Sequence, residues 1–368
     1  MEKITISAIK ADVGGQPGHV TVPKPIIELA NEEMQKAKQN GELIDAHVFH
    51  AGDDLELLMT HKEGVNSSTI HELALNTFKK ATEKAKGMKL YGAGQDLLKE
   101  TFSGNIRGMG PGIAEMEFPE RKSEPLLVFA ADKTDSGAFN LPLYKIFGDP
   151  FNTAGLVIDS NMHDGFEFTV LDVKQGREIT LQLPEQTYDL LALIGSVNRF
   201  VIKKVFSKNK TIAKGPCAVS STQKLSKIAG SYVGKDDPVC IVRSQHGLPA
   251  VGEVLEGFSL GHLVEGWMRG SHFGPLMPVS QENAKCTRFD GPPRVVGLGF
   301  QLVNGRLSEP LDLFDDPAFE ETRRRVQEIA DYLRRHGPFE PHRAAPESME
   351  YTTLPDVLAK LEDEWKEV

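Results

Sequence analysis

The sequence predicts a single α/β domain whose strands form a mixed or antiparallel sheet. Segments with the two-residue alternation of strands and segments with helical periodicity follow one another through all 368 residues. No Pro/Ser-rich linker, composition break or internal repeat divides the chain, so we predict one domain over residues 1–368. The glycine fingerprints of dinucleotide-binding and phosphate-loop folds are missing, which disfavours a doubly wound parallel sheet.

The composition is that of a soluble globular protein. Hydrophobic residues make up 40% of the chain and charged residues 26%, as in ordinary globular domains. The net charge of −10 argues against a nucleic-acid partner but permits anionic small substrates. Cys217, Cys240 and Cys286 lack metal-ligand spacing, which predicts reduced thiols. The chain shows no apolar signal region and no run of membrane-spanning length, so we expect a cytoplasmic protein with no membrane partner.

The first half of the chain has clear periodicity. Ile4, Ile6 and Ala8 alternate with Thr5 and Ser7, which predicts a strand at the start of the chain. The other elements predicted in this half are strands at 46–50, 55–61 and 126–131, and helices at 25–40 and 69–86 that end at Gly41 and Gly87.

The second half gives weaker patterns. Residues 140–185 indicate loops and strands, and residues 219–229 are ambiguous. Residues 255–300 are predicted to be unusually irregular, and long irregular segments inside compact domains are often functional. The clearer elements are strands at 200–206 and 239–243, and helices at 188–194, 317–335 and 355–366.

Three strand-like segments in the first third of the chain are each followed by aspartate. Asp12 ends the first, Asp53 and Asp54 follow the second, and Asp132 ends the third. This recurrence indicates strand ends that converge on one site. Hard oxygen ligands of this kind suit Mg²⁺, and because His19 is the one histidine candidate nearby, a three-histidine zinc site is disfavoured. Taken singly, each aspartate could instead cap a turn or a hairpin.

Two loop-like regions offer groups for binding phosphate. Gly104, Gly108, Gly110 and Gly112 expose successive backbone N–H groups that can cradle a phosphate, although such loops also serve as plain connectors. Arg269 could bind a phosphate through two parallel hydrogen bonds, or it could tie loops together as a buried arginine.

Residues 232–237, with the sequence YVGKDD, combine a phenol, a lysine and two carboxylates. A nucleophilic lysine must be neutral, and neighbouring carboxylates oppose this by raising its pKa. Lys235 beside Asp236 and Asp237 therefore suits a nucleophile only if the carboxylates point elsewhere in one state, for instance towards metal ions. Gly234 would permit such a movement. The alternative is a solvated turn with an incidental salt bridge.

A series of short motifs spreads over nearly the whole chain: Asp12 with Gly18-His19, Gly52-Asp53-Asp54, Gly94-Gln95-Asp96, Ser103-Gly104-Asn105, Ala131-Asp132-Lys133, Tyr232-Val233-Gly234-Lys235-Asp236-Asp237, Trp267-Met268-Arg269-Gly270-Ser271-His272 and Arg288-Phe289-Asp290-Gly291-Pro292-Pro293. In this order they resemble the bifunctional fructose-1,6-bisphosphate aldolase/phosphatases, the archaeal-type or class V fructose-1,6-bisphosphatases. The resemblance implies a four-layer α-β-β-α sandwich and a homo-octamer.

The resemblance also implies two reactions at one site. Dihydroxyacetone phosphate and glyceraldehyde 3-phosphate are joined to fructose 1,6-bisphosphate, whose 1-phosphate is then hydrolysed to give fructose 6-phosphate. By motif, Lys235 forms the Schiff base, Tyr232 transfers the proton of the aldol step, and Asp12 activates water. The implied ligands of several Mg²⁺ ions are Asp12, His19, Asp53, Asp54, Gln95, Asp132, Asp236 and Asp237. The implied sugar- and phosphate-binding residues are His19, Tyr91, Gly104, Asn105, Asp132, Lys133, Gln245, Arg269, Asp290 and Tyr351.

Two other functions remain compatible with these residues. In a Mg²⁺-dependent sugar phosphatase with one activity, Lys235 would only anchor phosphate and no covalent adduct would form. In a non-catalytic sugar-phosphate-binding protein, ligand would bind without metal and without turnover. The intact lysine, tyrosine and carboxylates favour the bifunctional enzyme over both.

Overall fold

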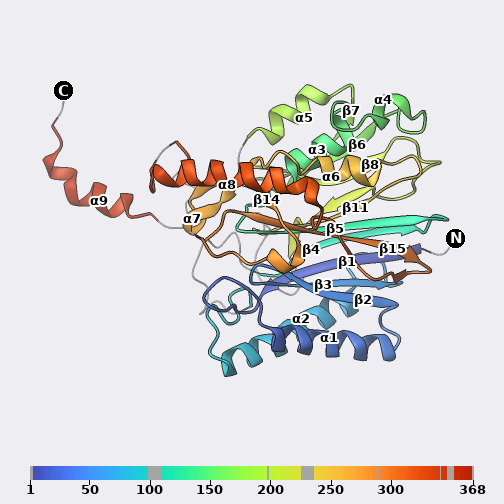
Figure 1. Ribbon diagram of the computed structural model, residues 1–368, viewed down its shortest axis with the longest axis horizontal. Coiled ribbons are helices and arrows are strands. Elements are labelled where there is room, and N and C mark those ends of the chain that lie inside the picture. Colours follow the sequence, from blue (N-terminus) through green and yellow to red (C-terminus); the bar gives the residue numbers. More distant parts are fainter. Residues whose placement is uncertain are drawn as a thin grey trace.

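The computed structural model describes residues 3–97, 110–196, 199–224, 236–288, 290–339, 341–345 and 352–366. Its elements lie in layers (Figure 1). Helices α1 (Lys24–Gln39) and α2 (Ser68–Gly87) cover one face of a first sheet, and a second sheet packs on the other face. Helices α3 (Asn140–Gly148), α5 (Thr187–Ile194) and α6 (Val251–Glu256) lie beyond the second sheet. The predicted α/β class is confirmed.

The first sheet has the strand order β10-β4-β1-β3-β2, and its neighbours are antiparallel. Residues 112–119 carry no predicted strand, yet they form β4 and pair with almost the whole of β1. The bounds are β1 (Lys3–Asp12), β2 (Asp45–Ala51), β3 (Asp54–His61), β4 (Gly112–Pro119) and β10 (Gln223–Lys224).

The helices on the first sheet form where their sequences predict them. In α1, Ile26, Ala30, Met34 and Ala37 recur every three or four residues and are all buried against the sheet. In α2, the Ser67 side chain accepts a hydrogen bond from the backbone N–H of residue 70 and satisfies one of the free donors of the first turn.

The second sheet is mixed and has the order β14-β15-β5-β11-β9-β8-β6-β7, with β16 and β17 also paired to β15. Within this path only β14 and β15 run parallel. The bounds are β5 (Glu124–Asp132), β6 (Phe166–Asp172), β7 (Arg177–Leu183), β8 (Phe200–Ser207), β9 (Ala218–Ser220), β11 (Val239–Arg243), β14 (Met277–Pro278), β15 (Arg294–Val303), β16 (Arg306–Leu307) and β17 (Leu311–Asp312).

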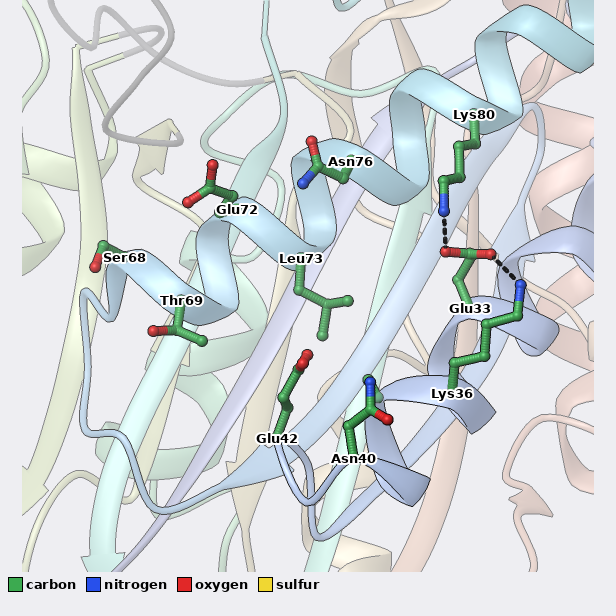
Figure 2. Close-up of a pocket in the computed structure, with 11 residues that line it drawn as sticks. Glu33, Lys36, Asn40, Glu42, Ser68, Thr69, Glu72, Leu73, Asn76 and Lys80 are labelled. Carbon is green, nitrogen blue, oxygen red and sulfur yellow. Dashed lines mark hydrogen bonds and ion pairs between the residues drawn. The ribbon is translucent and has the colours of Figure 1, made fainter.

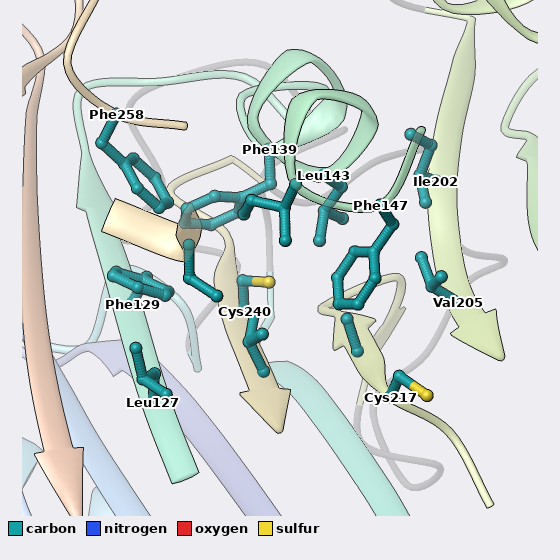
Figure 3. Packing of buried hydrophobic residues seen from close by; sticks show 14 of the residues in the cluster. Leu127, Phe129, Phe139, Leu143, Phe147, Ile202, Val205, Cys217, Cys240 and Phe258 are labelled. Atoms are coloured by element: carbon teal, nitrogen blue, oxygen red, sulfur yellow. The ribbon is translucent and has the colours of Figure 1, made fainter. Parts of the chain in front are cut away.

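Strand β5 is buried on both faces because it separates two hydrophobic cores. Leu126 and Val128 pack into the core between the two sheets. Leu127 and Phe129 point the other way, towards the helices, as Figure 3 shows. Successive side chains of a strand face opposite sides, so this alternation makes a near-continuous apolar run necessary. The strand predicted at 126–131 is confirmed.

Residues 255–300 are less irregular than predicted. They include β12 (Leu263–Gly266), β13 (His272–Pro275) and the first part of the ten-residue β15. Two glycines make β15 hard to recognise as a strand from the sequence. A Cβ atom at Gly297 would lie 2.9 Å from the Phe129 ring, and one at Gly299 would lie 2.9 Å from Leu313. These glycines admit large neighbours rather than mark loops.

The prediction of loops and strands for residues 140–185 is wrong at two places. Residues 140–148 form α3, and α4 (Gly155–Ile158) is a single helical turn. Helix α3 packs Leu143, Ile146 and Phe147 into the core (Figure 3 labels the first and last), and Pro142 lies in its first turn. Its short apolar sequence offers no polar stripe from which helical periodicity can be read.

The chain ends with α8 (Glu320–Arg335) and α9 (Leu354–Leu361), close to the predicted ranges. Cys217, Cys240 and Cys286 are all free and buried, and burial raises the pKa of the Cys217 thiol to about 11. Among the described residues, every helix is too short or too polar to pass through a lipid bilayer.

Candidate active site

Strand ends from both sheets meet at one place. Asp12 ends β1 and lies opposite Asp54, the first residue of β3, in the antiparallel register. Asp53 lies in the tight turn that joins β2 to β3. Asp132 ends β5, and Asp237 lies just before β11. These two strands are paired, and Val239 of β11 lies opposite Ala130, so Asp237 comes to the same end as Asp132. The structure thus brings the predicted aspartates of the first third together, and adds Asp237.

The first group of potential metal ligands consists of Asp12, His19 and Asp53. The His19 Nδ1 atom lies 2.6 Å from Asp53 Oδ2 and 3.7 Å from Asp12 Oδ2. Gln95 belongs to the same place, because a Cβ atom at Gly92 would lie 3.2 Å from both Gln95 Oε1 and the His19 ring.

The second group consists of Asp54, Asp132 and Asp237. Asp132 is fully buried and Asp54 is 2% exposed. Asp237 is held by its neighbours: its Oδ1 accepts a hydrogen bond from the Thr134 backbone N–H at 2.8 Å, and its own N–H donates to the Thr134 carbonyl at 3.0 Å. These contacts fix the Asp237 carboxylate towards the other two.

Two lysines balance part of this negative charge. Lys133 Nζ lies 2.9 Å from Asp53 Oδ1 and 3.0 Å from Asp132 Oδ1, so it links the two groups. Lys10 Nζ lies 2.7 Å from Asp54 Oδ2. Burial opposes the charge on each lysine, but the adjacent carboxylates outweigh it and raise both pKa values well above the usual range.

The carboxyl groups respond differently to this crowding. Burial and the neighbouring charges raise the pKa of Asp132 to about 7 and that of Asp237 to about 7. Burial also raises the pKa of Asp12, with Asp53 and Asp54 adding to the effect. Burial would raise the pKa of Asp53 too, but Lys133 and His19 outweigh it and lower that pKa. The second group is therefore short of positive charge.

The residues present fit divalent cations. Asp132 Oδ2 and Gln95 Oε1 are buried oxygen atoms without a hydrogen-bond partner in the described structure. Buried polar atoms are rarely left unsatisfied without a functional reason. Oxygen atoms from several carboxylates and one amide are the donor set that Mg²⁺ prefers. A cation at each group would satisfy its orphan atom, Gln95 Oε1 at the first and Asp132 Oδ2 at the second, and the cation at the second group would relieve the raised pKa values there.

Several predicted substrate-binding residues surround these groups. The Tyr91 ring packs edge-on against His19 with centroids 4.7 Å apart, and it is 56% exposed at the rim. The charge of Asp290 acts on both His19 and Lys133. The turn that carries Arg269 adjoins Lys133, because a Cβ atom at Gly266 would lie 2.9 Å from the Lys133 carbonyl.

Buried Trp267 organises the loops that carry Arg269 and Asp290. Added Cβ atoms at Gly274 and Gly291 would both collide with its ring. Met268 and Arg269 adopt left-handed backbone angles, with φ of 47° and 62°. The His272 ring lies within hydrogen-bonding distance of the Met268 carbonyl, at 3.3 Å, and helps to hold this turn.

Gln245 is not brought to this place within one chain. It follows the last residue of β11, whereas Asp237 precedes the first. The last residue of β11, Arg243, pairs with Leu126 near the start of β5, and Asp132 lies at the other end of β5. Its carbonyl accepts a hydrogen bond from Arg121 at 2.8 Å. Five residues of strand separate the two ends by about 15–20 Å. The role of Gln245 in substrate binding stays a prediction.

Five predicted site residues lie outside the described residues, so the structure does not place them: Gly104, Asn105, Tyr232, Lys235 and Tyr351. Asp236 is described, and its charge acts on Lys10 and Asp237. Two buried groups were not predicted. Lys10 is one, and Asp96, whose Oδ2 accepts the Asp12 backbone N–H at 2.9 Å, is the other. The sequence offers one signal for Lys10. It is a lysine within an apolar strand, and because it precedes Asp12 by two residues, both lie on the same face of that strand.

The close approach of Gly52 to Asp132 gives a testable prediction. Gly52 has φ of +55°, and a Cβ atom there would overlap the Asp132 carboxylate. We expect Gly52→Ala to displace Asp132 and to weaken divalent-cation binding, measured by calorimetry, by about 100-fold. Gly41→Ala is the matched control, since Gly41 has φ of +77° and its Cβ would meet open space. Equal cation affinities for the two variants would contradict the prediction.

A separate groove of about 440 Å³ lies between α1 and α2 (Figure 2). Glu33 crosses it and accepts hydrogen bonds from Lys36 and Lys80. The lining includes none of the predicted site residues. We assign no ligand to this groove, because both of its lysines already pair with Glu33.

Comparisons with known proteins agree with the motifs. A profile of the fructose-1,6-bisphosphatase family matches residues 3–366. The fructose-1,6-bisphosphate aldolase/phosphatase of Thermococcus onnurineus is 62% identical over 370 residues, covering 100% of this chain and 99% of its own. The proteins of that name from Sulfurisphaera tokodaii and Moorella thermoacetica are each 59% identical, covering 99% and 100% of this chain and 94% and 95% of their own. This chain belongs to the fructose-1,6-bisphosphate aldolase/phosphatase family of fructose-1,6-bisphosphatases.

Proposed function

We propose that this protein is a bifunctional gluconeogenic enzyme. It would join dihydroxyacetone phosphate and glyceraldehyde 3-phosphate to fructose 1,6-bisphosphate and then hydrolyse the 1-phosphate to give fructose 6-phosphate. The observation that carries the proposal is the pair of adjoining carboxylate groups with orphan oxygen atoms, in a chain whose full-length relatives bear that double name. The proposed location is the cytoplasm and the proposed assembly is a homo-octamer.

Mg²⁺ ions are the proposed cofactor. They would be held by Asp12, His19, Asp53, Asp54, Gln95, Asp132, Asp236 and Asp237. When bound, such ions polarise phosphoryl oxygens and lower the pKa of water. Lys133 is placed to neutralise a phosphate at the junction of the two groups, since it already bridges their carboxylates.

In the phosphatase step, Asp12 is the proposed general base. Its carboxylate lies in the first group of potential metal ligands, with Oδ2 3.7 Å from His19 Nδ1, where an attacking water would bind. Its Oδ1 also accepts the Gly14 backbone N–H at 2.9 Å, and the Asp12 N–H is held by Asp96, so its orientation is fixed. Asp12 would take a proton from the attacking water as the phosphorus–oxygen bond to the sugar breaks and the leaving oxygen is protonated.

In the aldol step, the neutral Lys235 amine would attack the ketone carbon of dihydroxyacetone phosphate and expel its oxygen as water. The resulting iminium ion accepts the electron pair released when the neighbouring carbon loses a proton. That carbon then bonds to the aldehyde carbon of glyceraldehyde 3-phosphate, Tyr232 supplies the proton for the new hydroxyl, and water releases the product from Lys235.

The two steps need different arrangements of residues 232–237. In the described structure Asp237 faces Asp54 and Asp132, which is the arrangement proposed for phosphate hydrolysis. For the aldol step the carboxylates would turn away and Lys235 would reach the substrate, in the manner of loops that rearrange around ligands. Structures with each ligand that shared one Lys235–Asp237 conformation would contradict this switch.

Borohydride trapping tests the proposal. With dihydroxyacetone phosphate and Mg²⁺, reduction should leave an adduct on the peptide that contains Lys235, and Lys235→Ala should abolish it; peptide mass mapping provides the measurement. No adduct, with phosphate still released from fructose 1,6-bisphosphate, would reduce the protein to a metal-dependent phosphatase. Ligand binding without metal and without turnover would instead indicate a sugar-phosphate-binding protein.

A further inference from the structure

Lys10 is a buried cation beside the second carboxylate group, and the proposed function gives it no role. Its side chain is 1% exposed, and its Nζ lies 2.7 Å from Asp54 Oδ2 and 3.9 Å from Asp237 Oδ2. Because Lys10 comes two residues after Ala8, it lies on the face of β1 that packs between the two sheets. An enclosed ammonium in that position must stay among its carboxylates, since burying it unpaired would be very costly.

The two lysines of the site differ in what they can do. Lys133 lies near the rim, with a side chain that is 13% exposed, and is predicted to bind substrate phosphate, so it can exchange partners during turnover. Lys10 is enclosed, with a side chain that is only 1% exposed in the described structure. Its partners come from different sheets: Asp54 begins β3 of the first, and Asp237 precedes β11 of the second.

We propose that Lys10 is an internal cation that joins the two sheets at the site and, while Asp237 faces Asp54 and Asp132, holds Asp54 and Asp237 in place whether or not a divalent cation is bound. It is a positioning residue and contacts no reacting atom. The metal-dependent part of this inference rests on the proposed function, because it takes the second carboxylate group as a Mg²⁺ site. The part that concerns the metal-free protein does not.

Thermal unfolding of Lys10→Met tests the proposal. Methionine keeps roughly the length of lysine but removes the charge, which leaves the second carboxylate group without its fixed cation. We expect the melting temperature of the metal-free protein to fall by about 5 °C or more. Added Mg²⁺ binds the folded protein and should replace the missing charge, so it should raise the melting temperature of Lys10→Met more than that of wild type.

Two further variants make the outcome decisive. Lys38→Met removes an ion pair of 2.6 Å between Lys38 of α1 and Asp45 of β2, whose side chains are 29% and 15% exposed, and should change the melting temperature by no more than about 2 °C. Adding Asp54→Asn to Lys10→Met removes the stranded charge and should recover at least half of the loss. If Lys10→Met does not fold, the double variant is measured instead, and its folding supports the proposal while its failure overturns it.

The proposal is overturned if Lys10→Met melts within 2 °C of Lys38→Met or if Asp54→Asn deepens the loss. Its metal-dependent part is overturned if Mg²⁺ stabilises Lys10→Met no more than wild type. These readouts need no turnover. A wild-type protein that released no phosphate and formed no Schiff base would overturn the proposed function, yet the comparison of the metal-free variants would stand.

Discussion

Replacing Asp53 by asparagine should lower phosphate release from fructose 1,6-bisphosphate by about 1,000-fold while the protein stays folded. Asp53 is 3% exposed, and it holds His19 through Oδ2 at 2.6 Å and Lys133 through Oδ1 at 2.9 Å. Asparagine has the same shape but can accept through only one of these atoms and carries no charge. The substitution therefore removes the charge of one proposed metal ligand and weakens the contacts that hold His19 and Lys133.

The measurement is the steady-state rate of phosphate release at saturating substrate and a range of Mg²⁺ concentrations. Asp45→Asn is the control, since Asp45 begins β2 at the end remote from Asp53 and pairs with Lys38. It should keep the wild-type rate within about twofold, because surface and half-exposed ion pairs contribute little. A rate for Asp53→Asn within tenfold of wild type would remove Asp53 from the site, whatever the melting temperature.

The largest effect on stability is expected for Glu124→Gln, which should lower the free energy of unfolding by about 3 kcal/mol or more. Glu124 and Arg243 are both fully buried, with Arg243 Nη2 donating to Glu124 Oε2 at 2.8 Å. Arg121 donates to the same carboxylate at 2.7 Å, and the Arg243 guanidinium lies 3.9 Å above the Phe118 ring. Removing the only carboxylate from this arrangement would leave buried guanidinium charge uncompensated.

The effect should depend on pH. Burial would raise the pKa of Glu124, but Arg243 and Arg121 outweigh it, and the pKa is lowered. A lowered folded-state pKa stabilises the fold above the ordinary value of about 4.3 and loses that contribution as the pH falls through the folded-state pKa. The difference between wild type and Glu124→Gln should therefore be full at pH 7 and shrink below about pH 4.

Urea unfolding at fixed protein concentration and several pH values provides the measurement. Glu321→Gln is a suitable control, because Glu321 pairs with Arg324 on the exposed side of α8 and should matter little to stability. Similar unfolding midpoints for the two variants would contradict the prediction. Because Arg121 also donates to the Gln245 carbonyl, Glu124→Gln should additionally loosen the loop that carries Gln245.

The sequence patterns predict those parts of the site that depend on strand periodicity. Asp12 and Asp132 end apolar strands, so their place at strand ends follows from the local sequence pattern. The register of the β2–β3 turn then brings in Asp53. What could not be predicted depends on pairing between distant segments. Local sequence does not reveal that Asp237 is held by Thr134. The predicted strand at 239–243 does place Asp237 and Gln245 at opposite ends, although the resemblance assigns both to one site.

The misplaced elements have similar causes. The glycines of β15 suggest loops in the sequence, whereas in the structure they leave space for the side chains of Phe129 and Leu313. Helix α3 is apolar on most sides because it is short and enclosed by the core, so it lacks the polar stripe of a surface helix. Lys10 looks like an interruption in an apolar strand until Asp54 and Asp237 are seen beside it. In each case the missing information is the identity of a neighbour far away in the chain.

Because the carboxylates of the site come from two sheets, the site can form only when both sheets have folded and packed together. Asp12, Asp53 and Asp54 belong to the first sheet, whereas Asp132 and Asp237 belong to the second. Neither sheet alone can gather the full set of ligands, and contacts between segments so distant in the chain form late, because chain closure opposes them. Catalytic activity would then appear only after the first sheet packs on the second, and cation binding would report on folding of both sheets together.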